Sequence, residues 1–206
     1  FIATEDDLFY KHKGVRPDAI LNSVLYMLQT GRVRGASTIT MQVVRNVEDL
    51  RVGTERTMER KINEAINALQ VEREFTKDEI LELYLNQIFL GGSAYGVEAA
   101  SWQYYGKSCR ALTLGEGAAL AGLTRSPNWN RPDRYPENAR QRRDIVLEQM
   151  FENQFVTEQE YETALNETLE DSVLTAEKRA EMMARREGMW AANQIGRASC
   201  RERVYC

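Results

Sequence analysis

The sequence predicts an all-α fold for this chain of 206 residues, and three observations support that prediction. Capping boxes of the form Thr-x-x-Glu, which start helices by satisfying backbone N–H groups, begin at Thr76, Thr113 and Thr157. Apolar residues recur at spacings of three and four between these start signals. The alternation of strand and helix that a parallel sheet requires is missing. We therefore expect about seven or eight helices.

The first long helix is predicted over residues 17–30. Pro17 suits a first helical position and Gly31 suits a helix end. The apolar residues on its repeating stripe are Ile20, Leu21, Val24, Leu25 and Leu28. A basic, glycine-containing turn follows at 32–36. The β-branched run at 37–45 is the one place where a strand is conceivable.

A second long helix is predicted over residues 55–75. Its apolar stripe consists of Met58, Ile62, Ala65, Ile66 and Leu69. A second stripe, about 200° round from Met58 and Ile62, carries Arg56, Arg60 and Glu64. This polar stripe is either a solvated face, where each i,i+4 pair contributes only ~0.3–0.5 kcal/mol, or part of a chemical site.

The capping boxes place further helices after residues 76, 113 and 157, and the second of these helices is rich in alanine. Residues 126–132 read as a loop and 137–151 as a helix with three arginines. Beyond about residue 170 the chain is highly charged. We interpret 170–194 as a linker or the start of a truncated second region. Residues 195–206 resemble the translation of a sequencing adapter, so we exclude them from fold reasoning.

Composition excludes several functional classes. The chain is 43% hydrophobic and 28% charged, with a net charge of −4, which argues against a general polyanion binder such as a nucleic-acid protein. The three cysteines and one histidine lack metal-ligand spacing. No apolar run reaches the ~18 to 20 residues needed to cross a bilayer. Because the chain starts at Phe1, we expect that an anchoring segment has been cut away before it.

Residues 4–14 contain the acidic cluster that matters most for the predicted function. They place Glu5, Asp6 and Asp7 ahead of the aromatic pair Phe9-Tyr10. Three acids before an apolar run are typical of the charged first turn of a helix, and most such clusters face solvent. The alternative is a catalytic carboxylate, and the downstream motifs favour it.

Five stretches in order carry a resemblance to a known family. They are Glu5-Asp6…Phe9…His12-x-Gly14, Gly35-Ala-Ser37-Thr38-Ile-Thr40-Met-Gln42, Arg60-Lys61-x-x-Glu64, Lys77-x-x-Ile80-Leu-x-x-Tyr84-Leu85-Asn86 and Arg143-x-x-Val146-Leu147. Together they resemble the peptidoglycan glycosyltransferase (transglycosylase) domain of class A penicillin-binding proteins and the monofunctional transglycosylases, glycosyltransferase family 51. The resemblance covers about residues 1–169.

The resemblance implies a lysozyme-like helical fold and the polymerisation of lipid II into glycan strands, with release of undecaprenyl pyrophosphate. It implies Glu5 as general base and Glu64 as the second essential carboxylate. The substrate-binding residues expected from the motifs are Ser37, Thr38, Gln42, Arg45, Arg56, Arg60, Lys61, Asn86 and Arg143. It also implies work at the outer face of the bacterial cytoplasmic membrane and a possible transpeptidase domain downstream. No cofactor is obligatory, although Mg²⁺ or Mn²⁺ at the pyrophosphate is left open.

The chemistry explains these residue types. A sugar hydroxyl is a poor nucleophile near neutral pH, so a carboxylate must take its proton during attack. The pyrophosphate leaving group is a weak base that needs cations more than a proton, and arginine and lysine supply them. Ser37 and Thr38 have no basic partner evident in the sequence, so we expect hydrogen bonding from them and not nucleophilic attack. His12 has no such partner either and is expected to be structural.

Two departures from the family pattern and two alternatives remain. Arg45-Asn46 replaces the usual Lys-Asn, and the segment 47–54 is about three residues longer than usual. A lysozyme-like glycan hydrolase would also use two carboxylates, although a neutral polysaccharide gives the cations near Glu64 nothing to bind. A non-catalytic glycan-binding module is the other alternative.

Overall fold

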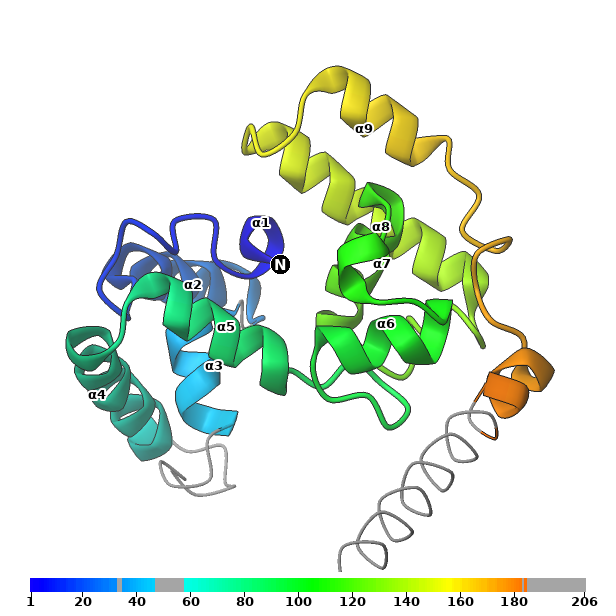
Figure 1. Cartoon of the computed structure of the whole chain (residues 1–206). Helices are drawn as coiled ribbons and strands as arrows, with labels where there is room; N and C mark the ends of the chain where they lie inside the picture. Colours follow the sequence, from blue (N-terminus) through cyan, green and yellow to red (C-terminus); the bar gives the residue numbers. More distant parts are fainter. Residues whose placement is uncertain (33–34, 47–57, 183, 185–206) are drawn as a thin grey trace, which may run out of the picture.

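The computed structural model describes residues 1–32, 35–46, 58–182 and 184, and over these residues the chain is helical (Figure 1). In the described residues the β structure is limited to one isolated bridge, between Phe89 and Tyr95. The α-helices are α1 (Ile2–Glu5), α2 (Pro17–Thr30), α3 (Ile39–Asn46), α4 (Met58–Glu74), α5 (Lys77–Gln87), α6 (Val97–Tyr105), α7 (Leu114–Gly122), α8 (Pro136–Glu152) and α9 (Glu158–Leu165). Two short 3₁₀ helices, η2 (Cys109–Ala111) and η3 (Leu123–Arg125), flank α7. The all-α prediction is confirmed, while the lysozyme-like arrangement stays a prediction.

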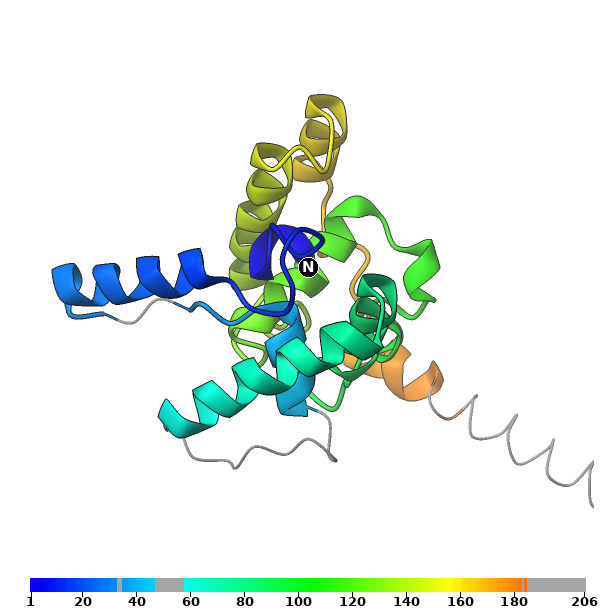
Figure 2. The ribbon, with the colours of Figure 1, turned by 90° about the vertical axis from the view of Figure 1, so that its left-hand side faces the viewer.

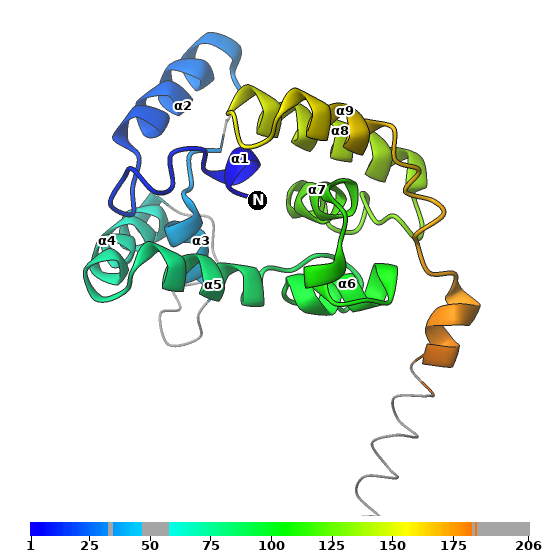
Figure 3. The ribbon, with the colours of Figure 1, turned by 45° about the horizontal axis from the view of Figure 1, so that its top comes forward.

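The helices form two groups with α1 between them (Figures 1 and 3). In the first group α3 packs against both α4 and α5, and in the second α7 packs against α8, which also contacts α9. A large apolar core extends from the first group into α6 and the end of α7. A smaller cluster joins α7, α8 and α9. Helix α2 projects away from both groups (Figure 2).

The local start and stop signals fold as predicted. Thr76, Thr113 and Thr157 each complete a reciprocal capping box with the glutamate three residues later. Pro17 begins α2, and Gly31 ends it in the left-handed conformation, at φ 69°. These signals act within one helical turn, so no distant contact is needed to set them.

The β-branched run at 37–45 forms helix α3 and not the strand that its composition allowed. Two side chains cap its first turn: Asp6 Oδ2 accepts a hydrogen bond from Ile39 N at 3.0 Å, and Thr38 Oγ1 accepts one from Met41 N at 3.1 Å. Residues 39–44 are all buried. Capping and burial therefore override the strand propensity of the run.

The face of helix α4 that packs against the core is opposite to the face expected from the sequence. The predicted apolar stripe is largely exposed, with Ile62 at 56% and Ile66 and Leu69 also exposed, whereas Glu64 is 0% exposed. Ala68 and Val71 share the buried face with Glu64. Residues 55–57, the predicted first turn, lie outside the described part of the chain.

Helix α2 is also unusually apolar on its surface. Its exposed large side chains are Ile20, Leu21, Leu25, Tyr26, Met27 and Leu28, the last of them 73% exposed. Even so, among the residues that the structure describes, no helix combines the length and the apolar character needed to cross a bilayer.

Residues 169–182, mostly expected to be linker, pack against the second group. Leu169 is buried, Val173 packs against the large core, and Leu174 N donates to Tyr104 O at 2.8 Å. The helical residues 176–182 follow. The domain boundary at residue 169 stays a prediction, and the expectations for 185–194 and 195–206 fall on residues that the structure does not describe.

Candidate active site

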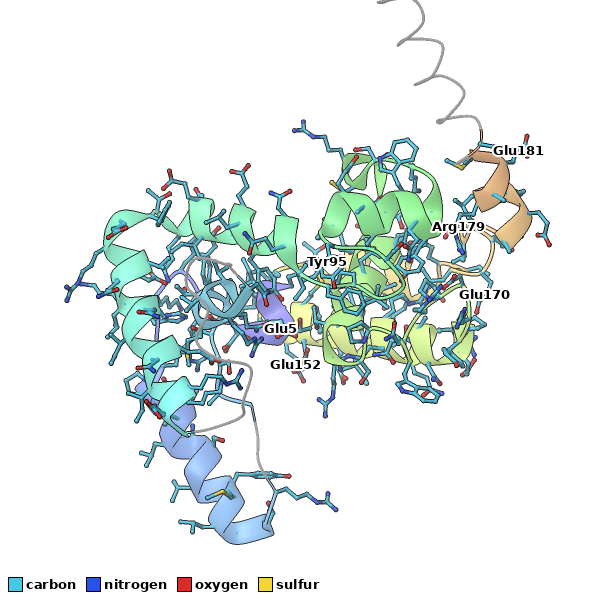
Figure 4. The ribbon with its side chains drawn as sticks, turned by 90° about the horizontal axis from the view of Figure 1, so that it is seen from below. Glu5, Tyr95, Glu152, Glu170, Arg179 and Glu181 are labelled. Carbon is cyan, nitrogen blue, oxygen red and sulfur yellow. The ribbon has the colours of Figure 1, made fainter. Side chains whose placement is uncertain are left out.

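Glu5, at the end of α1, lies between the two groups of helices (Figure 4). Its side chain receives one hydrogen bond from each group. Gln42 Nε2 on α3 donates to Oε2 at 2.9 Å, and Thr124 Oγ1 on η3 donates to Oε1 at 2.6 Å. The residue is half-buried. Two neutral donors therefore orient the Glu5 carboxylate.

The other two acids of the first motif are structural. Asp6 is buried and accepts hydrogen bonds from Ile39 N and from His12 Nε2, the latter at 2.9 Å. His12 Nδ1 accepts from Gly14 N at 3.1 Å, so the His12 proton lies on Nε2 and faces Asp6. Asp7 is paired with Arg16 at the surface. The predicted structural role of His12 fits these contacts, which fix the start of α3 and thereby Gln42.

Glu64 is a fully buried carboxylate held by two cations. Lys61 Nζ donates to Glu64 Oε2 at 2.6 Å, and Arg60 Nη1 lies 3.3 Å from Glu64 Oε1. Lys61 also donates to Ser37 Oγ at 2.8 Å. The polar stripe of α4 is thus neither solvated nor a set of surface pairs. Removing one member of such a buried pair is far costlier than breaking an exposed one.

Arg45 lies one helical turn beyond Gln42 on α3 and is exposed. Both it and Glu5 act on the buried ring of Tyr84. Burial raises the pKa of Tyr84, the Glu5 carboxylate raises it further, and the Arg45 guanidinium opposes both effects. Glu5 and Arg45 are therefore close to the same phenol.

Two arginines that the sequence analysis did not single out come close to one another, and one of them comes close to Glu5. Burial lowers the pKa of Arg142 on α8, the neighbouring guanidinium of Arg125 lowers it further, and the Glu5 carboxylate opposes these effects. Arg142 Nε is buried without a hydrogen-bond partner among the residues that the structure describes. Together with Thr124, these arginines form the α7–α8 side of the site.

Arg143, predicted to bind substrate, has a structural role instead. The residue is 2% exposed, and its guanidinium donates to Glu167 O at 2.6 Å and to Leu165 O at 3.1 Å. Its Nε donates to the neighbouring Asp144. It fastens the end of α9 to α8, and each of its three nitrogens already donates within the fold.

Two further predicted residues, Thr38 and Asn86, lie elsewhere, and a third is not described. Thr38 is buried, caps α3 and donates to Gly14 O at 2.6 Å, so its hydroxyl is used within the fold. Asn86 is exposed at the end of α5, where its amide donates to Glu82 O at 2.8 Å. Arg56 falls in the part of the chain that is not described. The structure therefore gathers Ser37, Arg60, Lys61 and Glu64 in one place, and Gln42 with Glu5 in another.

The described residues form no preformed site for a divalent ion. Within the described residues, no three or more of histidine, cysteine, aspartate and glutamate gather as a metal would require. Mg²⁺ and Mn²⁺ prefer carboxylate oxygens, and here the oxygens of Glu64 are already occupied by cations. We therefore derive no step through a metal.

The chain is similar to known proteins over most of its length. The family model described as Transglycosylase matches residues 1–151. The chain is 48% identical over 170 residues to penicillin-binding protein 1A of Aquifex aeolicus, covering 82% of this chain and 23% of that protein. It is 42% identical over 199 residues to penicillin-binding protein 1A of Pseudomonas aeruginosa, covering 95% of this chain and 24% of that protein.

Among solved structures, the crystal structure of penicillin-binding protein 1A from Haemophilus influenzae matches 66% of this chain and 17% of that chain. The identity is 32% and the TM-score 0.46. The chain thus spans about a quarter or less of the length of these relatives.

Proposed function

Because this chain belongs to the transglycosylase family, we propose that it polymerises peptidoglycan glycan strands. In this reaction the growing strand is transferred from undecaprenyl pyrophosphate onto the sugar hydroxyl of lipid II, with inversion at the anomeric carbon. The observation that carries the proposal is the position of Glu5: an oriented carboxylate with cationic side chains on both sides of it.

Glu5 is the proposed general base. The attacking hydroxyl must lose its proton as the new glycosidic bond forms, and a held carboxylate can accept that proton. Gln42 and Thr124 aim the carboxylate from opposite groups of helices without adding a formal charge beside it. Asp6 is the poorer candidate for the base, because its carboxylate is buried and caps α3, whereas Glu5 is only half-buried.

The donor's pyrophosphate is proposed to bind at Arg45, Arg60 and Lys61. Arg45 and Lys61 reach solvent, so they can bind an anion that arrives from outside. Glu64 neutralises part of this charge and fixes the direction of Lys61 through the 2.6 Å contact. Cations held in place before the reaction stabilise the departing pyrophosphate without reorganisation.

Arg125 and Arg142 are proposed to bind the second pyrophosphate. Both substrates of this reaction carry one, so the enzyme needs an anion site on each side of the base. A guanidinium such as that of Arg142, whose charge is disfavoured by burial and by the neighbouring Arg125, gains from an anion placed beside it. Their position on the α7–α8 side, away from Lys61 on α4, matches that need.

The exposed apolar faces of α2 and α4 support contact with a membrane surface. Large apolar side chains that face solvent on two helices are typical of an interaction site. Both substrates are lipid-linked, so an enzyme resting on the bilayer meets them directly. We propose the outer face of the cytoplasmic membrane as the location, and a transpeptidase region elsewhere in the same protein.

Product analysis tests the proposal. The purified chain is incubated with lipid II in vesicles, and the glycan is separated by length. Strands longer than lipid II are expected. Unchanged lipid II together with shortening of added glycan strands would establish a hydrolase, and no change in either substrate would establish a binding module.

A further inference from the structure

A second concave site lies along α6, at a distance from the cations around Glu64. The loop 91–96, helix α6 and the segment 174–182 enclose a solvent-open groove of about 610 Å³. Asn86, Tyr95 and Trp102 line it, and Arg179 borders it at the other end. Of the site residues predicted from the sequence, only Asn86 is among the residues that line this groove.

The charged groups of the groove already have partners within the protein. Hydrogen bonds from the Cys109 side chain, from Cys109 N at 2.8 Å and from Trp102 Nε1 at 2.8 Å lower the pKa of Glu98 to about 2, so this carboxylate stays negatively charged. Arg179 Nη1 lies 3.0 Å from Asp133 Oδ2, and its Nε donates to Gln103 O at 2.8 Å. An anionic ligand would find the Arg179 cation already paired and the Glu98 carboxylate facing it, so the groove does not suit the pyrophosphate end of a strand.

The polar groups left over are neutral and lie beside aromatic rings. Tyr95 is 65% exposed, and its ring packs on Phe89 at a centroid distance of 5.0 Å. The Tyr95 hydroxyl and the Asn86 amide oxygen hydrogen-bond to none of the residues that the structure describes. Aromatic faces with a few neutral hydrogen-bonding groups suit sugar rings, which present C–H faces and hydroxyl and amide edges.

We propose that this groove is a binding subsite for the uncharged sugars of the glycan strand. Helix α5 lies between the groove and the reaction centre. Its Tyr84 ring packs against Phe1 at the start of α1, while Asn86, about 200° further round the helix, lines the groove. The pyrophosphate end of a strand stays among the cations, while its neutral body needs another place to lie. The inference rests on the proposed polymerase function.

The segment 174–182 gives the groove one wall. Arg179 joins this segment to Asp133 in the loop before α8 and to the backbone of α6. A methyl group added at Gly106 would meet Leu174 and Met182 at 2.9 and 3.0 Å, so the segment lies tightly on the end of α6. A strand bound in the groove would therefore lie between the transferase fold and the chain that follows it.

Two measurements on one exposed substitution test the subsite. Tyr95→Ala removes the ring at the surface, and Tyr10→Ala is the matched control, because Tyr10 is 55% exposed on another part of the molecule. Binding of a lipid-free tetramer of β-1,4-linked N-acetylglucosamine is followed by NMR. Strand length and the rate of the first coupling of two lipid II molecules are measured in parallel.

We expect Tyr95→Ala to bind the tetramer about three- to tenfold more weakly. The strands should be shorter, while the first coupling proceeds at the parent rate and Tyr10→Ala behaves like the parent. Equal binding and equal strand length in all three proteins would overturn the subsite. Binding that requires peptide-bearing strands would overturn the assignment to sugars. A parent that makes no polymer yet binds the tetramer through Tyr95 would refute the polymerase function and leave the sugar site standing.

Discussion

Replacing Glu5 with glutamine is the most direct test of the proposed reaction. Glutamine keeps the size and reach of glutamate but cannot accept the proton of the attacking hydroxyl. Loss of a general base typically slows a reaction about 10²- to 10⁴-fold. We expect a fall of that size in the rate of strand elongation, with the pyrophosphate sites intact.

The structural cost of the same substitution is expected to be small. Glu5 accepts one hydrogen bond from Gln42 and one from Thr124. A glutamine at position 5 retains one acceptor oxygen, and its new amide can donate to the Gln42 oxygen once that side chain turns over. At most one neutral hydrogen bond is lost, which costs about 1 kcal/mol of folding stability. The loss of rate should therefore far exceed the loss of stability.

Asp7→Asn is the matched control, because it removes the same charge from the same motif. Asp7 is exposed and pairs with Arg16 at the surface, away from Gln42 and Thr124. Both variants are compared by lipid II polymerisation and by thermal melting. If Glu5→Gln elongates strands within threefold of Asp7→Asn, Glu5 is not the base and the reasoning fails.

Three further outcomes are expected. Arg142→Ala should lower turnover at an unchanged melting temperature. Arg143→Ala should instead lower stability by about 2–5 kcal/mol, because two partly buried carbonyls lose their donors. The reverse pattern in melting and activity assays would contradict the assignment. Glu64→Gln should reduce stability by about 1.5–3 kcal/mol, because Lys61 loses its charged partner. Substrate binding should weaken as well as the rate. A change in rate alone would argue against the role of Glu64 in orienting Lys61. The pKa of Glu98 is lowered to about 2 from the ordinary 4.5, so the charged carboxylate stabilises the fold above pH 4.5 and this effect disappears as the pH falls through 2. Glu98→Gln should therefore melt at a lower temperature than the parent at pH 7 and at nearly the same temperature near pH 2. Melting curves at a series of pH values will show this.

The helix starts could be predicted from the sequence because their causes are local. Each capping box is complete within four residues, and all three form as expected. Helix α3 could not be predicted this way. Its first turn depends on Asp6, which lies 33 residues before the Ile39 amide that it caps. A strand-propensity scale counts the β-branched residues of the run but takes no account of a carboxylate so distant in the sequence.

Helical periodicity showed which residues of α4 share a face but not which face is buried. The usual rule assigns the apolar stripe to the core. Here the core side carries Glu64, whose charge is offset by Lys61 and Arg60, while Ile62 and its neighbours face outward. The rule assumes that water covers the outer face, and the membrane contact proposed above would remove that assumption. A helix that rests on a membrane can leave its apolar stripe on the outside.

Arg142 and Arg143 show how finely a site depends on helix geometry. Successive residues on a helix point about 100° apart, so neighbouring arginines cannot both face the same site. Ala139, Val146 and Leu147 stand four before and three and four after Arg143, and this spacing puts Arg143 on the apolar face of α8. The sequence thus held the signal that Arg143 is buried. That Arg142 then lies near Glu5 depends on the packing of α1 against α8 and on a Thr124–Glu5 contact spanning 119 residues, which no local pattern encodes.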